Sequence, residues 1–207
     1  MTKQILTFAF LGAFLIFISA SASFAQSVEQ QVAKIRQLYT STNKQIDAGL
    51  EDNTQGLHYA AWTVGGERDG QQWSGVGTMH STDEFYFDCE PGRIEECGAD
   101  ARKLVRKIVS VYEGAADLKT RNEYLFTDKG ELAFVYKSEL VDVGEDNVQV
   151  RKTVEQRFYF AKGKLIHIAR EGKNTDARFT AENLQKSKDA ISEANRLRNI
   201  FALAFAE

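Results

Sequence analysis

The sequence predicts an α+β fold, in which an antiparallel meander sheet of six to eight strands has an N-terminal and a C-terminal amphipathic helix packed on one face. Three observations predict this class. One apolar pattern with helical period follows the leader, a second closes the chain, and the stretch between them is rich in β-branched and aromatic residues separated by turn glycines. The length of residues 26–207 fits a single α+β domain with its own core.

The first 25 residues have the three-part pattern of a secretory signal peptide. Lys3 supplies the positive charge, an apolar run follows at 5–20, and the small residues Ser23 and Ala25 precede the expected cut. The alternative, an N-terminal membrane anchor, is disfavoured because the run is shorter than the roughly twenty residues that a span needs. We therefore predict that residues 1–25 are cleaved, that no stable membrane span remains, and that the protein is exported to the periplasm or the extracellular medium.

The charge of the chain argues against a nucleic-acid partner. The full sequence has a formal net charge of −3, and loss of Lys3 with the signal peptide makes it −4. Acidic and basic residues are interspersed along the chain, and the sequence has no basic stripe of the kind that a nucleic-acid binder needs to neutralise phosphates.

The two cysteines, Cys89 and Cys97, are predicted to form a disulfide bond, because an exported chain meets an oxidising compartment. The short loop between them contains Pro91-Gly92, a pair suited to turning the chain. In the chain-entropy picture a bridge across such a small loop contributes somewhat under ~3 kcal/mol. A structural zinc site is the alternative, but the sequence lacks the second pair of ligands that such a site needs.

The mature chain is predicted to open with an amphipathic helix from Ser27 to about Ala48. Ser27 and Gln30 fit a capping box, and Gly49 is a suitable stop. The apolar stripe of this helix has spacings of three and four residues and consists of Val28, Val32, Ile35, Tyr39, Thr42 and Ile46.

After this helix the pattern changes to that of strands. We expect a hairpin whose turn lies at Gly66–Gly70, so that His58 lies opposite about Gly77. A further strand is expected at Glu84–Cys89. The β-branched stretch at about residues 103–113 favours another strand, although its first half also suits a helix.

Two related segments follow, Arg121–Leu140 and Val154–Lys173, and each is predicted to be a hairpin with a glycine in its turn. Together they predict a four-stranded meander over about Asn122–Glu171. Strand alternation places Phe158 and Phe160 towards the core. The opposite face of that strand, which should be wet or only partly covered, carries Glu155, Arg157 and Tyr159.

The paired hairpins resemble those of a loose group of uncharacterised exported bacterial proteins. The segments that carry the resemblance read "NEYLFTDKGELAFVY" and "EQRFYFAKGKLIHI". The group combines a leading helix, a strand-rich middle and paired β-hairpins of the pattern R-x-Y-F…G-K-L-I, and Phe158 stands where that motif usually has a further tyrosine. The resemblance covers about residues 104–173 and implies an exported protein, but it supplies no catalytic residues.

The chain closes with a second predicted helix, for which Thr180 is a good N-cap. Neither terminal helix is stable alone in water unless its apolar stripe is covered, and the sheet is the obvious cover. The stripe of the second helix consists of Leu184, Ile191, Ala194, Leu197, Phe201 and Phe205.

Histidines and carboxylates near the first strands are the candidates for metal binding or catalysis. His58 and His80 flank the predicted first hairpin, and together with a carboxylate they would hold a metal if the register brought them close. The alternative function is a small periplasmic hydrolase or metal-dependent enzyme that uses these histidines and the acidic loop of residues 83–100. Partly exposed strand histidines and a solvated loop are the structural interpretation of the same residues. The carboxylates of the loop are Asp83, Glu84, Asp88, Glu90, Glu95, Glu96 and Asp100.

The sequence has neither a G-x-S-x-G nucleophile elbow nor a phosphate-binding P-loop. We therefore predict a non-catalytic binding or interaction module without a cofactor, whose partner is a protein or a glycan. Trp62, Trp73 and Tyr86 are its candidate binding residues, because aromatic side chains on the first strands would offer a flat surface if they face outward. Packing in the core is the other interpretation of these aromatics.

Overall fold

The fold is α+β, as the sequence predicts. The computed structural model describes residues 28–52, 54–65, 80–90, 93–97, 100–114, 119–145, 148–174 and 179–205, and the predicted signal peptide lies outside these ranges. A helix at residues 28–51 comes first. The elements that follow are β1 (His58–Gly65), β2 (His80–Phe87), α2 (Ile94–Cys97), the 3-10 turn η1 (Ala101–Lys103), β3 (Val105–Glu113), β4 (Lys119–Phe126), β5 (Leu132–Glu145), β6 (Val148–Ala161), β7 (Lys164–Arg170), β8 (Lys173–Asn174) and α3 (Ala181–Phe205).

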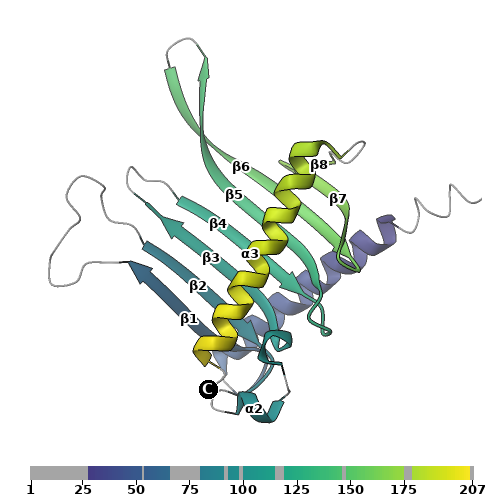
Figure 1. The fold of residues 1–207 in the computed structure, drawn as a ribbon, viewed down its shortest axis with the longest axis vertical. Helices are drawn as coiled ribbons and strands as arrows, with labels where there is room; N and C mark the ends of the chain where they lie inside the picture. The colour runs from purple at the N-terminus through teal and green to yellow at the C-terminus, as the bar shows by residue number, and fades with distance from the viewer. Residues whose placement is uncertain are drawn as a thin grey trace, which may run out of the picture.

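The strands form one eight-stranded sheet whose spatial order follows the chain from β1 to β8 (Figure 1). Every neighbouring pair is antiparallel, so the whole sheet is the predicted meander. β5 and β6 are the longest strands and remain paired out to Glu145 and Val148. Their outer neighbours stop earlier, since β4 reaches only Ser138 and β7 only Gln156. The distal part of the β5–β6 hairpin therefore projects beyond the sheet (Figure 1).

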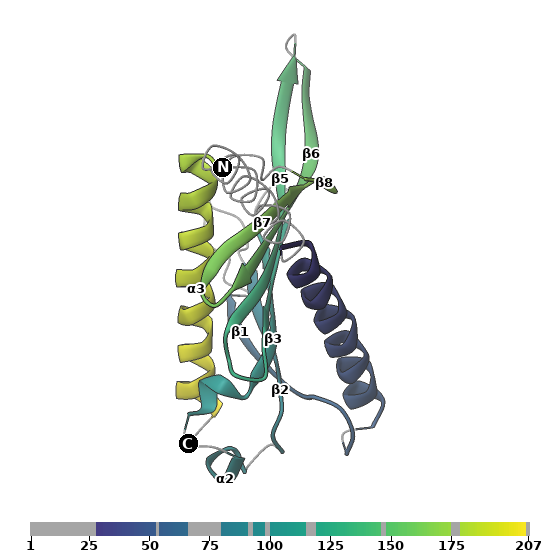
Figure 2. The same ribbon diagram turned by 90° about the vertical axis from the view of Figure 1, so that its right-hand side faces the viewer.

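The two terminal helices pack on opposite faces of the sheet, and the prediction that they share one face is wrong. Figure 2 shows α3 on one side of the sheet and the helix of residues 28–51 on the other. The reason is visible in β4, where three consecutive bulky residues, Tyr124, Leu125 and Phe126, are all buried. Side chains alternate between faces along a strand, so a run of this kind needs cover on both sides.

The face under α3 contains the larger hydrophobic cluster. Phe158 and Phe160 belong to it, as predicted, and so does the buried stripe of α3. The ring of Phe201 lies 4.9 Å from that of Phe87 and 5.5 Å from that of Phe85. The predicted N-cap of α3 is also present, because the Thr180 hydroxyl accepts a hydrogen bond from the backbone N–H of Asn183 at 3.1 Å. The α3 residues in the cluster are Ala190, Ala194, Leu197 and Phe201.

The first helix covers the other face through two smaller clusters. Its predicted stripe does face the sheet. Val32 and Ile35 pack with Phe134 and Tyr159, and Ile46 packs with residues of β2 and β3. The helix therefore crosses the sheet from β6 towards β2. The face that carries Tyr159 is covered by this helix over part of its area, which is one of the two outcomes predicted for it.

The register of the first two strands differs from the prediction. β1 pairs directly with β2, and His58 lies opposite Phe87 rather than opposite about Gly77. The expected turn at Gly66–Gly70 and the strand that was to follow it lie outside the described residues. Phe85 and Phe87 are fully buried under α3, and a register is strongly specified wherever one face is buried in this way.

The two related segments are structural copies of each other. Each folds as a hairpin, β4–β5 and β6–β7, and Gly130 and Gly163 have positive φ angles of 75° and 71° in the two turns. Both copies also shift register at the corresponding step, Leu125/Phe126 in one and Tyr159/Phe160 in the other. The duplication thus widens the sheet with a second hairpin of the same shape.

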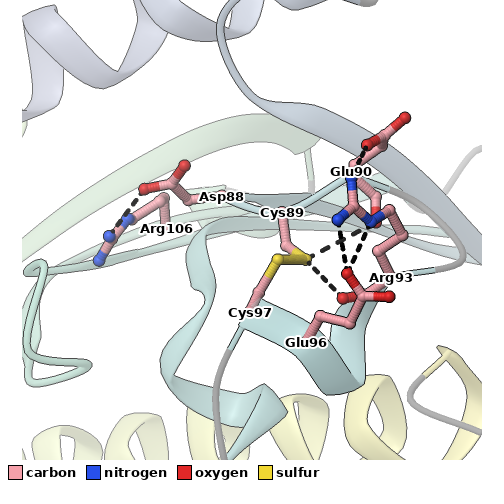
Figure 3. The surroundings of a disulfide bond; sticks show 7 residues. All are labelled: Asp88, Cys89, Glu90, Arg93, Glu96, Cys97 and Arg106. Carbon is pink, nitrogen blue, oxygen red and sulfur yellow. Dashed lines mark hydrogen bonds and ion pairs between the residues drawn. A yellow bond between two sulfur atoms is a disulfide. The ribbon is translucent and has the colours of Figure 1, made fainter.

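The predicted disulfide between Cys89 and Cys97 is present, with their Cα atoms 6.0 Å apart (Figure 3). It ties the short helix α2 to the chain that leaves β2. Arg93 in this loop donates to the Glu96 and Glu90 carboxylates at 2.8 and 3.2 Å. Cys89 and Ile94 belong to the α3-side cluster, so the bridge secures one end of the main core.

Candidate functional site

A cavity of about 530 Å³ lies between the first helix and the sheet. Its size falls within the range of about 300–1,000 Å³ that small-molecule sites occupy. The residues around it come from four elements, the helix of residues 28–51 and strands β4, β5 and β6. They are Ile35, Arg36, Tyr39, Thr40, Arg121, Glu123, Phe134, Tyr136, Arg157 and Tyr159.

One wall of this cleft is a face of the first helix. Ile35, Arg36, Tyr39 and Thr40 are spaced so that they share one side of the helix, since residues four apart lie one above the other. Ile35 is anchored in the cluster with Phe134, and the Tyr39 ring meets the Phe134 ring edge-on at 5.5 Å. Packing therefore fixes this wall against the sheet.

The opposite wall consists of rows of side chains across β4, β5 and β6. In the deepest row Leu125 pairs with Phe134 and Phe134 with Tyr159. The next row along the strands is Glu123, Tyr136 and Arg157, and the row after it is Arg121, Ser138 and Glu155. Neighbouring rows on one face are two residues apart, or about 7 Å. The wall consequently changes from apolar to charged over about 14 Å.

Glu123 is the most enclosed charged group of the cleft, and both of its oxygens accept hydrogen bonds. One oxygen lies 2.8 Å from the Lys107 ammonium and accepts from the Tyr39 hydroxyl at 2.7 Å, and the other accepts from Arg121 at 2.9 Å. Burial alone would raise the pKa of Glu123, but the hydrogen bonds and charges of these partners outweigh it and lower the pKa below its usual range. Glu123 is therefore ionised in the folded protein at neutral pH.

The pKa of Tyr39 is shifted in the opposite direction from that of Glu123. Burial, together with the hydrogen bond to the Glu123 carboxylate, raises the pKa of Tyr39 to about 12. A phenol with that pKa keeps its proton at neutral pH and donates a hydrogen bond to the Glu123 carboxylate. The Tyr39–Glu123–Lys107 group consequently forms a fixed polar anchor between helix and sheet, in which neither the Tyr39 phenol nor the Glu123 carboxyl has a pKa near 7.

The three arginines of the cleft use few of their donors on the described residues. Arg36 donates from Nε to the Tyr159 hydroxyl at 3.5 Å, Arg121 donates from Nε to Glu123, and Arg157 donates from Nη2 to Glu155 at 2.8 Å. Within the described ranges Arg36 makes no ion pair with a carboxylate. A guanidinium has five N–H donors, so each of the three retains donors for a ligand.

The structure does not bring the two candidate histidines together. His58 lies opposite Phe87 and His80 opposite Gly65, at the two ends of the β1–β2 pair. Seven residues of strand separate these positions, which is about 23 Å. Since a zinc–nitrogen bond is ~2 Å long, the two imidazoles cannot share an ion. Among the residues that the structure describes, no group of three or more potential ligands could hold a metal.

The carboxylates of residues 83–100 are also dispersed. Asp83 and Glu84 point to opposite faces of β2, Asp83 towards α3 and Glu84 towards the first helix. The others whose side chains are described pair mainly with arginines, Asp88 with Arg106 at 3.0 Å (Figure 3) and Asp100 with Arg102 at 2.7 Å. These pairs make a neutralised surface rather than a pair of catalytic carboxylates.

The candidate binding aromatics do not form one surface. Trp62 pairs with Asp83 and lies on the α3 face of the sheet, where it is 43% exposed. Tyr86 lies on the other face, is 8% exposed, and donates its hydroxyl to Glu84 at 3.1 Å. Trp73 lies outside the described residues. Trp62 and Tyr86 therefore cannot act on the same flat ligand.

The sequence contains two signals of the cleft that our sequence analysis did not use. Glu123 and Arg157 occupy equivalent positions in the two copies of the repeated hairpin, with Tyr136 between them in the sheet. Opposite charges at equivalent positions of a repeat indicate that the copies contribute different groups to a shared surface. Arg36 also stands next to the apolar stripe of the first helix, at the border of the face that packs on the sheet.

Comparison of the chain with models of known protein families, with curated proteins and with solved structures finds no match. The resemblance of the paired hairpins to exported bacterial proteins therefore stays a prediction. In the described part of the chain, no helix combines the length and the apolar character needed to cross a membrane.

Proposed function

We propose that this protein is an exported, non-catalytic binding module and that its ligand occupies the cleft between the first helix and strands β4–β6. The observation that carries the proposal is the cavity of about 530 Å³ in which three arginines and three tyrosines meet. Sites for small molecules are concave and combine aromatic or apolar walls with a few polar groups that fix orientation. The cleft has both components.

The rigidity of its two walls supports a ready-made site. The sheet wall is anchored from behind by the α3-side cluster, because neighbouring strand residues such as Tyr124 and Phe158 are fully buried there. The helix wall is held by Ile35 and by the hydrogen bond from Tyr39 to Glu123. The side chains around a preformed cavity lose little conformational freedom when a ligand binds, and this favours affinity.

The polar chemistry of the cleft supports binding over catalysis. Glu123 is saturated with donors, and the raised pKa of Tyr39 makes it a poor acid or nucleophile. The arginines present planar sets of N–H groups and act as hydrogen-bond donors. Export, which the signal-peptide pattern and the disulfide favour, would place this module in the periplasm or outside the cell.

The test is a thermal-shift screen of a chemically diverse small-molecule library against the oxidised mature protein and a variant with a filled cleft. Thr40→Trp adds an indole to an exposed position that borders the cavity. Gln37→Trp places the same group at an exposed position of the same helix that does not border the cavity. A ligand present at a hundred times its Kd stabilises the folded state by about 2.7 kcal/mol, which raises Tm by about 5–10 °C for a domain of this size.

We expect compounds that raise the Tm of the wild-type protein and of Gln37→Trp, and that no longer raise the Tm of Thr40→Trp. The proposal fails if the screen finds no stabilising compound. It also fails if every stabilising compound acts equally on the three proteins, because the ligand would then bind elsewhere.

A further inference from the structure

The distribution of charge in the cleft indicates which class of ligand it takes. We infer that the ligand is an amphipathic organic anion, with a carboxylate head bound by arginines and an apolar body bound by the aromatic side chains of the lining. This inference rests on the proposed function and deepens it. Three cationic side chains border the cavity, Arg36, Arg121 and Arg157, against a single anionic one, Glu123.

The single anion of the lining does not cancel the field of the arginines. Glu123 is already engaged by Lys107, whose ammonium lies 2.8 Å from it, as well as by Arg121. Nearby, Glu155 pairs with Arg157 at 2.8 Å, and the charge of Glu84 on β2 acts on Arg121. Arg36 has no such acidic partner among the described residues. With Lys107, Glu84 and Glu155 included, the region has four cations and three anions, and the excess charge is positive.

The arginine N–H groups that make no hydrogen bond with the described residues suit a carboxylate ligand. The Arg36 guanidinium stands over the Tyr159 ring, 5.7 Å from its centroid, and the Arg157 guanidinium stands over the Tyr136 ring at 5.6 Å. A cation–π contact with a ring restrains a guanidinium while leaving N–H groups that do not face the ring available to a ligand. A flat fork of N–H groups binds the two oxygens of a carboxylate with two parallel hydrogen bonds.

The aromatic side chains of the lining explain why the anion should be amphipathic. Phe134 and Tyr159 lie side by side with ring centroids 5.0 Å apart, and Ile35 packs on them from the helix. Both of these rings are buried, with exposed fractions of 7% and 3%. A small inorganic anion would satisfy the arginines but leave the half-buried rings of Tyr39 and Tyr136, which border the same cavity, in contact with water. A ligand with an aromatic or aliphatic body of the right length removes that surface from water, and the gain is proportional to the area buried.

The experiment measures affinity by titration calorimetry for matched triads of compounds. Each triad keeps one apolar body, phenyl, naphthyl, indolyl or octyl, and carries a propionate, the corresponding primary amide, or the corresponding amine. We expect at least one propionate to bind ten-fold or more tightly than its amide, and the amines not to bind. The triads change head-group charge while the apolar body stays constant, so they isolate the contribution of the carboxylate.

Two variants test the arginines. Arg36→Gln and Arg157→Gln keep a polar side chain but remove the charge and the fork. We expect each to weaken the best propionate ten-fold or more and to change its amide by less than three-fold. Arg93→Gln, at an exposed arginine beside the disulfide, is the matched control and should leave both affinities unchanged.

The outcomes distinguish this inference from the proposed function. Amides or amines that bind as tightly as the propionates, and are blocked by Thr40→Trp, would overturn the anionic class and leave the binding cleft in place. The same conclusion follows if no triad binds but the library contains other compounds that Thr40→Trp blocks. If neither the triads nor the library give a compound that Thr40→Trp blocks, both the inference and the proposed function fail.

Discussion

Under α3 the sheet is packed with fully buried aromatic and aliphatic side chains, whereas under the first helix it carries a buried ion pair and a cavity of about 530 Å³. Both faces have a helix as cover, yet only one is filled. The α3 face does contain polar atoms, since Asp83 Oδ1 and Tyr124 Oη are buried and make no hydrogen bond with the described residues. Burial raises the pKa of Asp83. None of these groups borders the cavity.

This contrast separates the source of stability from the proposed place of binding. Large aromatic side chains in a dry cluster contribute the most to folding per residue, because both transfer from water and close packing favour them. The cavity under the first helix lacks this packing and contributes little to folding. The strands β4–β6 serve both purposes, because alternate residues of the same strand point to the core and to the cleft.

The largest expected effect comes from the filled face. Phe201 is 0% exposed and contacts the rings of Phe85 and Phe87, so Phe201→Ala should lower the free energy of unfolding by about 4 kcal/mol. Urea unfolding of the oxidised mature protein measures this. Leu203→Ala on the same helix is the control, because Leu203 is 75% exposed and its loss should cost less than about 0.5 kcal/mol. A loss below about 1 kcal/mol for Phe201→Ala would contradict the role of α3 as the cover of the main core.

The second effect concerns the charged anchor of the other face. Glu123→Gln leaves the Lys107 ammonium buried without a negative partner, and we expect it to cost about 3 kcal/mol at pH 7. The folded-state pKa of Glu123 lies below its unfolded value of about 4.3. Its contribution to stability is therefore complete above that pH and is lost as the pH falls through the folded pKa.

Urea unfolding of both proteins between pH 7 and pH 2.5 tests this linkage. The difference between wild type and Glu123→Gln should shrink as the pH falls, because the wild-type carboxyl then becomes neutral as well. The control is Glu131→Gln, which changes the charge at an exposed turn and should show only a small difference from wild type at pH 7. A difference between wild type and Glu123→Gln that persists unchanged at pH 2.5 would contradict the assignment of the ion pair.

Much of the fold could be predicted from local patterns. The spacing of apolar residues gave both helices, and alternation with turn glycines gave the strands of the repeated hairpins, since these signals depend only on neighbours in sequence. The disulfide followed from cysteine count and compartment. The placement of the helices failed because Tyr124-Leu125-Phe126 was treated as a strand with one wet face, although three consecutive bulky apolar residues require burial on both sides.

The cleft was harder to predict because its residues are far apart in the chain. Glu123, Tyr136 and Arg157 become neighbours only through the register of β4, β5 and β6, and a single sequence does not specify that register without a turn of known geometry. Trp62 and Tyr86 are predicted as binding residues because they are large aromatics, but aromatic character alone does not distinguish exposed residues from buried ones. The arginines that border the cavity look like ordinary surface residues in the sequence.

The smallest expected effect on stability concerns Arg36, which borders the cavity. It tests most directly whether the two faces of the sheet differ. Arg36 is exposed, and its contacts with the described residues are a 3.5 Å hydrogen bond to the Tyr159 hydroxyl and a stacking contact with that ring. An exposed cation–π contact contributes about 0.5–1 kcal/mol at most, so Arg36→Gln should lower the free energy of unfolding by less than about 1 kcal/mol. Urea unfolding of Arg36→Gln, measured in parallel with Phe201→Ala, compares the two losses in free energy of unfolding directly. A loss above about 2 kcal/mol would mean that Arg36 holds the helix on the sheet, and its guanidinium would then be part of the scaffold rather than free to receive an anion.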